Sequence, residues 1–312
     1  MKLQKIYSTT DVHVAGEVFR IIHDVPLVHY RSLQELEEKL PAAFSEEISL
    51  LVKEPRGFAG ITGCLVVPPV SKEADIAAIF FSQEGTVSDH YGGIVAVLTA
   101  LLENGQLKEK ESGEYLIETV QGILSAAAVM EKEQVVSVGL KLGGCTLIQA
   151  DAPLNHLAYT VVQADQRYAL FHKSDVTAVI ELKELSALKE WGQSTLQALK
   201  PNPEIQGVIL MDDCSIQQGR LKTITFRKDG WIIRSPGFGP TAACLASLLS
   251  KGDLKPDEAI KNESIFGSFL EARAEQKGGK YQFNLEARGF ITGLQTFVLD
   301  PTDPLPKGFL IK

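Results

Sequence analysis

Two segments of the chain carry almost no charge and repeat each other's layout at a fixed distance. One is GGIVAVLTALLENG at Gly92–Gly105, and the other is GPTAACLASLLSKG at Gly239–Gly252. The offset is constant, because 239 − 92 and 252 − 105 both equal 147. Each segment ends in a glycine that suits a helix C-terminus. A helix that is apolar on every side must be buried, since some face would otherwise expose its side chains to water.

The rest of the chain is typical of short strands rich in Val, Ile, Phe and Thr, broken by glycine, proline or charge clusters. Examples are Glu17–His23, Ile76–Phe81, Val135–Leu142 and Val208–Met211. We therefore predict an α/β fold of two pseudo-symmetric halves, each a curled, mostly antiparallel sheet or barrel around a buried central helix. We expect the first half to span residues 1–118 plus 288–312, with its helix at about 92–104. The second half should span residues 119–287, with its helix at about 239–251.

The glycine-rich start of each central helix leaves backbone N–H groups unpaired at the positive end of the helix dipole. Such a helix start is a natural carboxylate site. If the halves face each other, both starts meet at one cleft between them. A structural repeat that holds no ligand is the alternative.

Composition and charge exclude classes of protein to which the chain does not belong. The chain has 312 residues, 45% hydrophobic and 22% charged, with a formal net charge of −8. We expect no nucleic-acid partner, because no basic run appears, and no membrane association, because no apolar stretch is long enough for a signal peptide or a membrane span. The four cysteines are widely scattered, which predicts buried thiols in the reducing cytoplasm and neither a metal site nor disulfides.

Short motifs in the chain resemble those of the proline racemase family. Thr10–Arg20 (TDVHVAGEVFR) resembles the family's opening Asp-x-His-Thr-x-Gly-Glu with a following Arg, with Val14 in place of Thr. His13 and Glu17 of this motif lie in strand-like sequence, where a spacing of four places both on one face of a sheet. The other matches are Glu54–Gly57 (EPRG), Gly63–Pro69 (GCLVVPP), Glu84–Gly85, Arg234–Pro236 (RSP) and Gly289–Phe309 (GFITGLQTFVLDPTDPLPKGF).

The resemblance covers nearly the whole chain in the family's order. It implies the fold shared by proline racemase and diaminopimelate epimerase, with a small amino or imino acid of the proline or hydroxyproline type bound between the halves. It also implies a reaction without pyridoxal phosphate or any other cofactor, and a homodimer. In the family, one cysteine thiolate removes the α-proton and an opposite cysteine supplies a proton to the other face.

Neither catalytic cysteine of the family is present. Counting from the matched motifs, the first cysteine position falls on His90 and the second on Gly237, which are again 147 apart. The residues that follow the first position are Tyr91, Gly92 and Gly93, and those that follow the second are Phe238 and Gly239. By the resemblance these residues line the ligand. The family's amine-binding Asp is Ile233 here.

Gly237 has no side chain and can transfer no proton, so racemisation by two cysteines is excluded. His90 is the remaining candidate base, because an unperturbed imidazole pKa of about 6.5 suits proton abstraction near neutral pH. A single base supports β-elimination, and Asp89 is placed to orient the imidazole. The alternative is that His90 only fills the space left by a lost active site. Ser235 and Thr241 flank the second helix start, where each is expected either to bind a ligand carboxylate or to cap the helix.

Three functions are compatible with these residues. The first is an enzyme, an isomerase or a hydroxyproline dehydratase, that still removes an α-proton with His90. The second is a ligand-binding or regulatory protein without turnover. The third is an inactive subunit that pairs with an intact paralogue.

Overall fold

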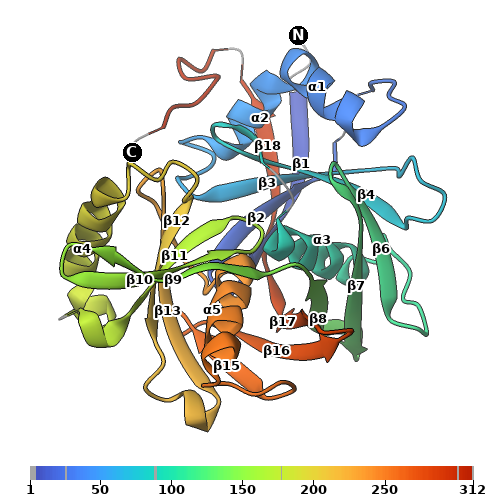
Figure 1. Cartoon of the computed structure of the whole chain (residues 1–312). Helices are drawn as coiled ribbons and strands as arrows, with labels where there is room; N and C mark the ends of the chain where they lie inside the picture. The colour runs from blue at the N-terminus through green and yellow to red at the C-terminus, as the bar shows by residue number, and fades with distance from the viewer. Residues whose placement is uncertain (1–4, 25–26, 88–89, 177, 301, 311–312) are drawn as a thin grey trace. The chain divides into compact units, whose positions relative to one another are not determined.

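Both charge-free segments form buried helices, as predicted. In the computed structural model, which describes residues 5–24, 27–87, 90–176, 178–300 and 302–310, helix α3 spans Tyr91–Glu103 and helix α5 spans Phe238–Lys251 (Figure 1). Every residue of α3 from Gly92 to Leu102 is buried. The same holds for α5 from Phe238 to Leu249. Each helix end is followed by a glycine in the left-handed region, Gly105 after α3 and Gly252 after α5, because a Cβ is disfavoured there.

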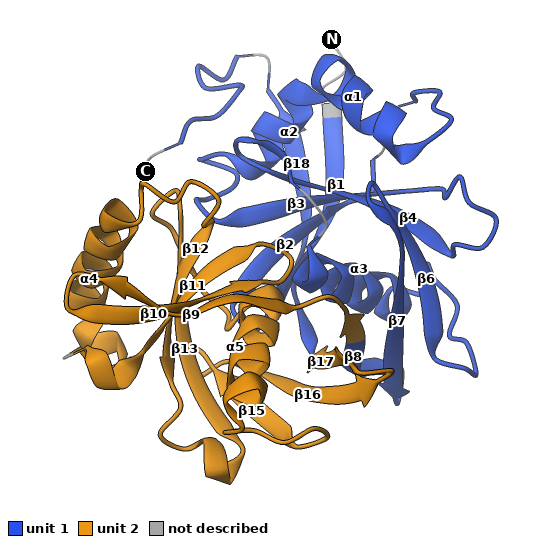
Figure 2. Cartoon of the chain, viewed as in Figure 1, with its two compact units in different colours: residues 1–139, 288–312 blue, residues 140–287 orange. Residues whose placement is uncertain are grey.

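The chain divides into two units, residues 1–139 with 288–312 and residues 140–287 (Figure 2). The chain returns to the first unit at residue 288. The first boundary lies after residue 139, whereas the sequence placed it after residue 118. The hairpin that follows residue 118 pairs with strands of the first unit, which keeps this segment there.

The first unit is a curled sheet in which helices cover both faces. Neighbouring strands follow the order β18 (Gly289–Leu299), β1 (Lys5–Val14), β2 (Glu17–Ile22), β3 (Ile61–Val67), β4 (Ile76–Ser82), β6 (Glu114–Thr119) and β7 (Gly122–Glu131). The β2–β3 and β4–β6 pairs are parallel, and the others are antiparallel. Strand β5 (Gly85–Val87) forms a hairpin with β4, and β8 (Gln134–Leu142) crosses the unit boundary.

Alternation along the strands gives this sheet two apolar faces. In β4, Ile79 and Phe81 belong to a cluster with buried leucines of α1 (Leu33–Ala43) and α2 (Ser45–Val52). Phe80 points the other way, toward Gly93 of α3. Successive side chains of a strand point to opposite faces, so a strand that is buried on both sides reads as the continuous apolar run IAAIFF.

The second unit repeats this arrangement. Its strands follow the order β9 (Thr146–Leu154), β10 (Leu157–Gln163), β11 (Arg167–His172), β12 (Gly207–Asp212), β13 (Arg220–Arg227), β15 (Ala259–Glu263), β16 (Phe269–Lys277) and β17 (Lys280–Ala287). The β11–β12 and β13–β15 pairs are parallel. Helix α4 (Leu185–Ala198) packs on β12 and β13, and α5 packs on β9, β10, β11, β16 and β17.

The order of elements is the same in both units. In each unit, an antiparallel strand pair is followed by surface helix and then by a strand parallel to the second strand of the pair. The next strand forms a hairpin with that parallel strand. A short strand follows, which is β5 in the first unit and β14 (Ile232–Ile233) in the second. The buried helix comes next, and a strand parallel to an earlier one follows it. The fold is therefore the mixed α/β fold of two related halves that the repeated segments predicted.

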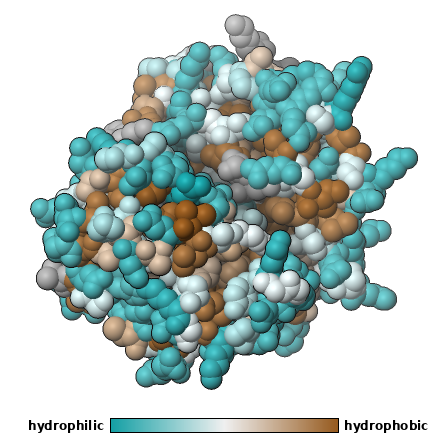
Figure 3. All heavy atoms as spheres, viewed as in Figure 1, coloured by the Kyte–Doolittle hydropathy of each residue, from teal (hydrophilic) through white to brown (hydrophobic). Residues whose placement is uncertain are grey.

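The surface of the molecule is mixed in character. On the face drawn in Figure 3, most side chains are hydrophilic and hydrophobic ones lie between them. Within the described ranges, no helix is both long enough and apolar enough to span a membrane.

Candidate functional site

Helix α3 begins at the first cysteine position. His90 is its N-cap residue, with extended backbone at φ −115° and ψ 101°, and its side chain makes no capping hydrogen bond. Its carbonyl accepts the first helical bond, from the N–H of Ile94 at 3.0 Å. Tyr91 is half-buried, and Gly92 and Gly93 are buried. The imidazole is thus carried on the N-cap of a buried helix. Asp89, proposed from the sequence to orient it, lies outside the described residues.

The imidazole of His90 rests on two buried phenylalanines. Its ring centroid lies 5.0 Å from that of Phe19, edge to face, and 6.5 Å from that of Phe80. The two glycines of the first turn let this packing occur. A Cβ at Gly93 would lie 2.4 Å from the Phe80 ring, and one at Gly92 would lie 3.0 Å from the Phe19 ring. The start of α3 therefore places an imidazole against two buried aromatic side chains.

Helix α5 begins at the second cysteine position with a different backbone. Its N-cap is Gly237, at φ 76° and ψ 134°, a conformation that residues with a Cβ rarely adopt. A Cβ at this position would also lie 2.8 Å from the ring of Pro240. A side chain at this position would therefore strain the backbone and crowd the following turn.

The polar residues around this helix start have partners inside the second unit. Ser235 is buried, and its hydroxyl accepts a hydrogen bond from the N–H of Gly237 at 3.0 Å. Thr241 is fully buried, and its hydroxyl accepts a hydrogen bond from the Asn262 amide at 2.8 Å. Phe238 and Gly239 are buried in the first turn. The ligand contacts expected of these residues remain predictions.

Asp165 lies at the start of α5, which the sequence did not indicate. It belongs to the turn between β10 and β11, and a Cβ at Gly239 would lie 1.7 Å from its Oδ1. The residue is exposed as a whole, but the protein around its carboxyl displaces enough water to raise the pKa above the ordinary 3.8. A carboxylate of the chain itself thus lies where the sequence led us to expect a ligand carboxylate. The sequence QADQR does not indicate that this turn lies next to a helix start, since polar residues are common in turns between strands.

The cysteines were predicted to be buried, which is wrong for two of them. Cys64 and Cys244 are buried, whereas Cys145 is half-buried and Cys214 is exposed, because these two lie in loops next to strand ends. Burial, with a smaller contribution from the charge of Asp165, raises the pKa of Cys145 to about 12. This thiol stays protonated near neutral pH and offers no thiolate base to replace the missing ones.

The motifs that carry the family resemblance hold the first unit together. Arg20 is buried and pairs with Asp11 through two hydrogen bonds of 2.9 and 2.7 Å, and it donates to the carbonyls of Leu51 and Arg56. Arg56 of the EPRG motif also forms an ion pair with Asp303 of the DPTDP motif. These contacts join the sheet to the segments that follow α2 and β18, so both motifs are structural.

The sequence suggested that His13 and Glu17 lie on one face of a sheet, which is wrong. A turn at Ala15 and Gly16, both with positive φ, separates β1 from β2, and His13 pairs with Val18 across the hairpin. The His13 ring instead stacks on Phe290 with centroids 5.1 Å apart.

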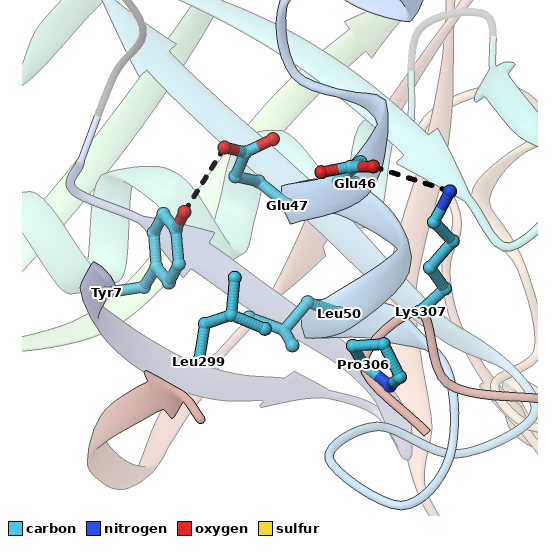
Figure 4. Close-up of a pocket in the computed structure, with 7 residues that line it drawn as sticks. All are labelled: Tyr7, Glu46, Glu47, Leu50, Leu299, Pro306 and Lys307. Atoms are coloured by element: carbon cyan, nitrogen blue, oxygen red, sulfur yellow. Dashed lines mark hydrogen bonds and ion pairs between the residues drawn. The ribbon is translucent and has the colours of Figure 1, made fainter. Parts of the chain in front are cut away.

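A small pocket in the first unit lies among other residues (Figure 4). Its polar groups are paired with one another, Tyr7 with Glu47 at 3.2 Å and Lys307 with Glu46 at 3.3 Å. None of the residues proposed from the sequence as catalytic or ligand-binding lines it. In the described part of the chain, no three His, Cys, Asp or Glu residues cluster as a metal site would require.

Comparison with known proteins gives one family over nearly the whole chain. The family model described as proline racemase matches residues 9–310. A trans-3-hydroxy-L-proline dehydratase of Bacillus cereus is 31% identical, and a proline racemase of Acetoanaerobium sticklandii is 26% identical, each over 100% of both chains. The solved structure of a hydroxyproline epimerase from Agrobacterium vitis, with bound trans-4-hydroxy-L-proline, has a TM-score of 0.83 at 24% identity and covers 99% of this chain and 96% of its own.

Proposed function

Because the chain belongs to the proline racemase family, we propose that it binds an imino acid of the proline or hydroxyproline type and removes the proton on the ligand's α-carbon with His90 as a single base. The observation that carries the proposal is the contrast between the two cysteine positions. One holds an imidazole at the start of α3, and the other is Gly237, which can neither accept nor donate a proton through a side chain.

A single base suits β-elimination better than racemisation. The imidazole takes the α-proton, and the electron pair left behind forms the Cα–Cβ double bond. The Cβ–O bond breaks as the hydroxyl takes this proton from the imidazolium and leaves as water, which restores the imidazole. The product is a cyclic enamine that rearranges to the imine. The reaction is redox-neutral, so it needs no oxidant or reductant. Racemisation instead requires a second group that delivers a proton to the opposite face.

The similarity to trans-3-hydroxy-L-proline dehydratases supports this choice of reaction. Relatives with that name, from Bacillus cereus and Bacillus thuringiensis, are 30–31% identical to this chain over its full length. A 3-hydroxylated proline has the leaving group on the carbon next to the acidic one, which an elimination by one base needs. We therefore propose a 3-hydroxyproline-type compound as the first substrate to test.

A second candidate is a binding protein without turnover. The Asp165 carboxylate against Gly239, and the lack of a side chain at Gly237, favour it. On this alternative the ligand stabilises the protein against heat but keeps its α-proton.

The test is a proton NMR survey in D₂O with proline and the 3- and 4-hydroxyprolines, using wild type, His90→Ala and His156→Ala. His156 lies exposed in the turn between β9 and β10 and serves as the control histidine. We expect loss of the α-proton signal or elimination with wild type and His156→Ala, and a rate about 10²- to 10⁴-fold lower with His90→Ala. Interconversion of D- and L-proline would overturn the proposal. Thermal stabilisation without any exchange would favour the binding protein.

A further inference from the structure

Phe19 holds a fixed place on the inner strand β2. It is fully buried, and its backbone lies between two neighbouring strands, opposite Val12 of β1 and Thr62 of β3. Successive side chains of a strand point to opposite faces. Phe19 therefore faces the first turn of α3, whereas Arg20 points the other way to its ion pair with Asp11. The phenyl ring thus extends toward α3 from a strand that is paired on both sides.

The ring of Phe19 meets the imidazole of His90 next to Gly92. The two ring planes lie at 77° to each other with centroids 5.0 Å apart, which is an edge-to-face arrangement that aromatic pairs prefer. A Cβ at Gly92 would lie 3.0 Å from Cζ of Phe19 and 3.5 Å from Nδ1 of His90. Both rings therefore lie against the first turn of α3, where a side chain at residue 92 would crowd them.

Phe19 makes the closer of the two phenylalanine contacts to this imidazole. The ring of Phe80 lies farther away, with centroids 6.5 Å apart and the planes at 54°. The imidazole is half-buried, and no capping hydrogen bond to the helix sets its orientation. Several staggered rotamers are open to such a side chain, and the packed ring of Phe19 favours one of them.

We infer that Phe19 is a positioning residue for the proposed base, because its ring holds the imidazole of His90 in one orientation at the start of α3. The inference rests on the proposed function, since it concerns the base assigned there. Proton transfer requires the base to lie within hydrogen-bond reach of the proton that it takes. A displacement of the base by about 1 Å is enough to slow a reaction by about 100-fold. Phe19 acts through His90 alone and has no chemical role of its own.

The test compares Phe19→Leu with Phe81→Leu. Both phenylalanines are fully buried in the same sheet, but Phe81 faces α1 and α2 and so serves as the matched control. One measurement is the steady-state rate of elimination from 3-hydroxyproline, separated into kcat and KM. The other is ¹³C relaxation at Cε1 of His90 in histidine-labelled protein without substrate, which reports the mobility of the ring. His90→Ala identifies the signal, and melting curves establish that each variant is folded.

We expect Phe19→Leu to lower kcat by about 10- to 100-fold and to leave KM within about twofold of wild type. The order parameter of the His90 ring should fall by about 0.2 in the same variant. Phe81→Leu should lower the melting temperature as much as Phe19→Leu and change neither kcat nor the mobility of the ring. Should either leucine variant fail to fold, the methionine variants give the same comparison, because methionine fills irregular space with less loss of packing.

A His90 ring that is as ordered in Phe19→Leu as in wild type overturns the inference, and so does an equal fall of kcat in the two leucine variants. The failure of the proposed function looks different. In that case the wild type removes no α-proton, or His90→Ala removes it at the wild-type rate. If His90→Ala stops the reaction and Phe19→Leu does not slow it, the inference alone fails.

Discussion

The starts of α3 and α5 hold equivalent places in two units with the same order of elements, but they have diverged in different ways. At α3 the N-cap residue His90 has an ordinary extended backbone and carries an imidazole. At α5 the backbone has a positive φ, a proline follows within the first turn, and an aspartate from a distant turn lies against the helix. The start of α3 thus carries a side chain that can transfer a proton, and the start of α5 does not.

This difference shows that the two positions are under different constraints. A histidine at the N-cap of α3 needs no other change. Gly92 and Gly93 leave space there, and the imidazole packs against the ring of Phe19. At the start of α5, a Cβ at Gly237 would crowd Pro240 and a Cβ at Gly239 would crowd Asp165, so the two glycines and their neighbours constrain one another. Substitutions at the two helix starts should therefore have unequal effects.

The largest effect is expected from a side chain placed inside the first turn of α3. In Gly93→Ala the new Cβ would meet the buried Phe80 ring at 2.4 Å, and the ring has no free space to enter. We expect a loss of about 3 kcal/mol in the free energy of unfolding. In Gly239→Ala the new Cβ meets Asp165, which can turn toward solvent at the cost of its two hydrogen bonds. The loss there should be about 1–2 kcal/mol.

Denaturant unfolding of both variants, alone and combined with Asp165→Ser, tests this contrast. The serine removes the carboxylate that the alanine displaces, so it should abolish the cost of Gly239→Ala and leave that of Gly93→Ala unchanged. Equal costs in all backgrounds would show that Asp165 does not fill the space next to Gly239.

Sequence patterns predicted the fold better than the site, and the elements show why. The buried helices were visible because burial on every side removes charge from the whole segment. The place of His90 at the start of α3 was also visible, because the residue lies next to that helix along the chain, and its role stays a prediction. Asp165 was not, because its place depends on how a turn between two strands lies against a helix far along the chain. The turn at Ala15 and Gly16 was missed because polar and apolar residues are mixed on both sides of it, as they are along one half-buried strand.

A cysteine restored at each position should be tolerated unequally. His90→Cys replaces one side chain at φ −115° and should change the free energy of unfolding by less than about 1 kcal/mol. Gly237→Cys places a Cβ at φ 76° and 2.8 Å from Pro240, and it should cost about 2 kcal/mol. Replacing Pro240 with glycine as well should recover only part of this cost, because the strain at φ remains. A Gly237→Cys protein as stable as wild type would mean that the backbone at the start of α5 relaxes to accommodate a Cβ.

The smallest expected effect is a change in the free energy of unfolding with pH, and it concerns the start of α5 alone. Partial dehydration raises the pKa of Asp165 in the folded protein above its ordinary value of 3.8. The folded state therefore binds more protons than the unfolded state in the range that begins near pH 3.8 and extends upward, so this group makes stability fall as pH rises through that range. Asp165→Asn removes the titration. Its free energy of unfolding relative to wild type should increase from pH 4 to pH 7. A difference between Asp165→Asn and wild type that is constant with pH would place the carboxylate in ordinary solvent and weaken its contrast with the start of α3.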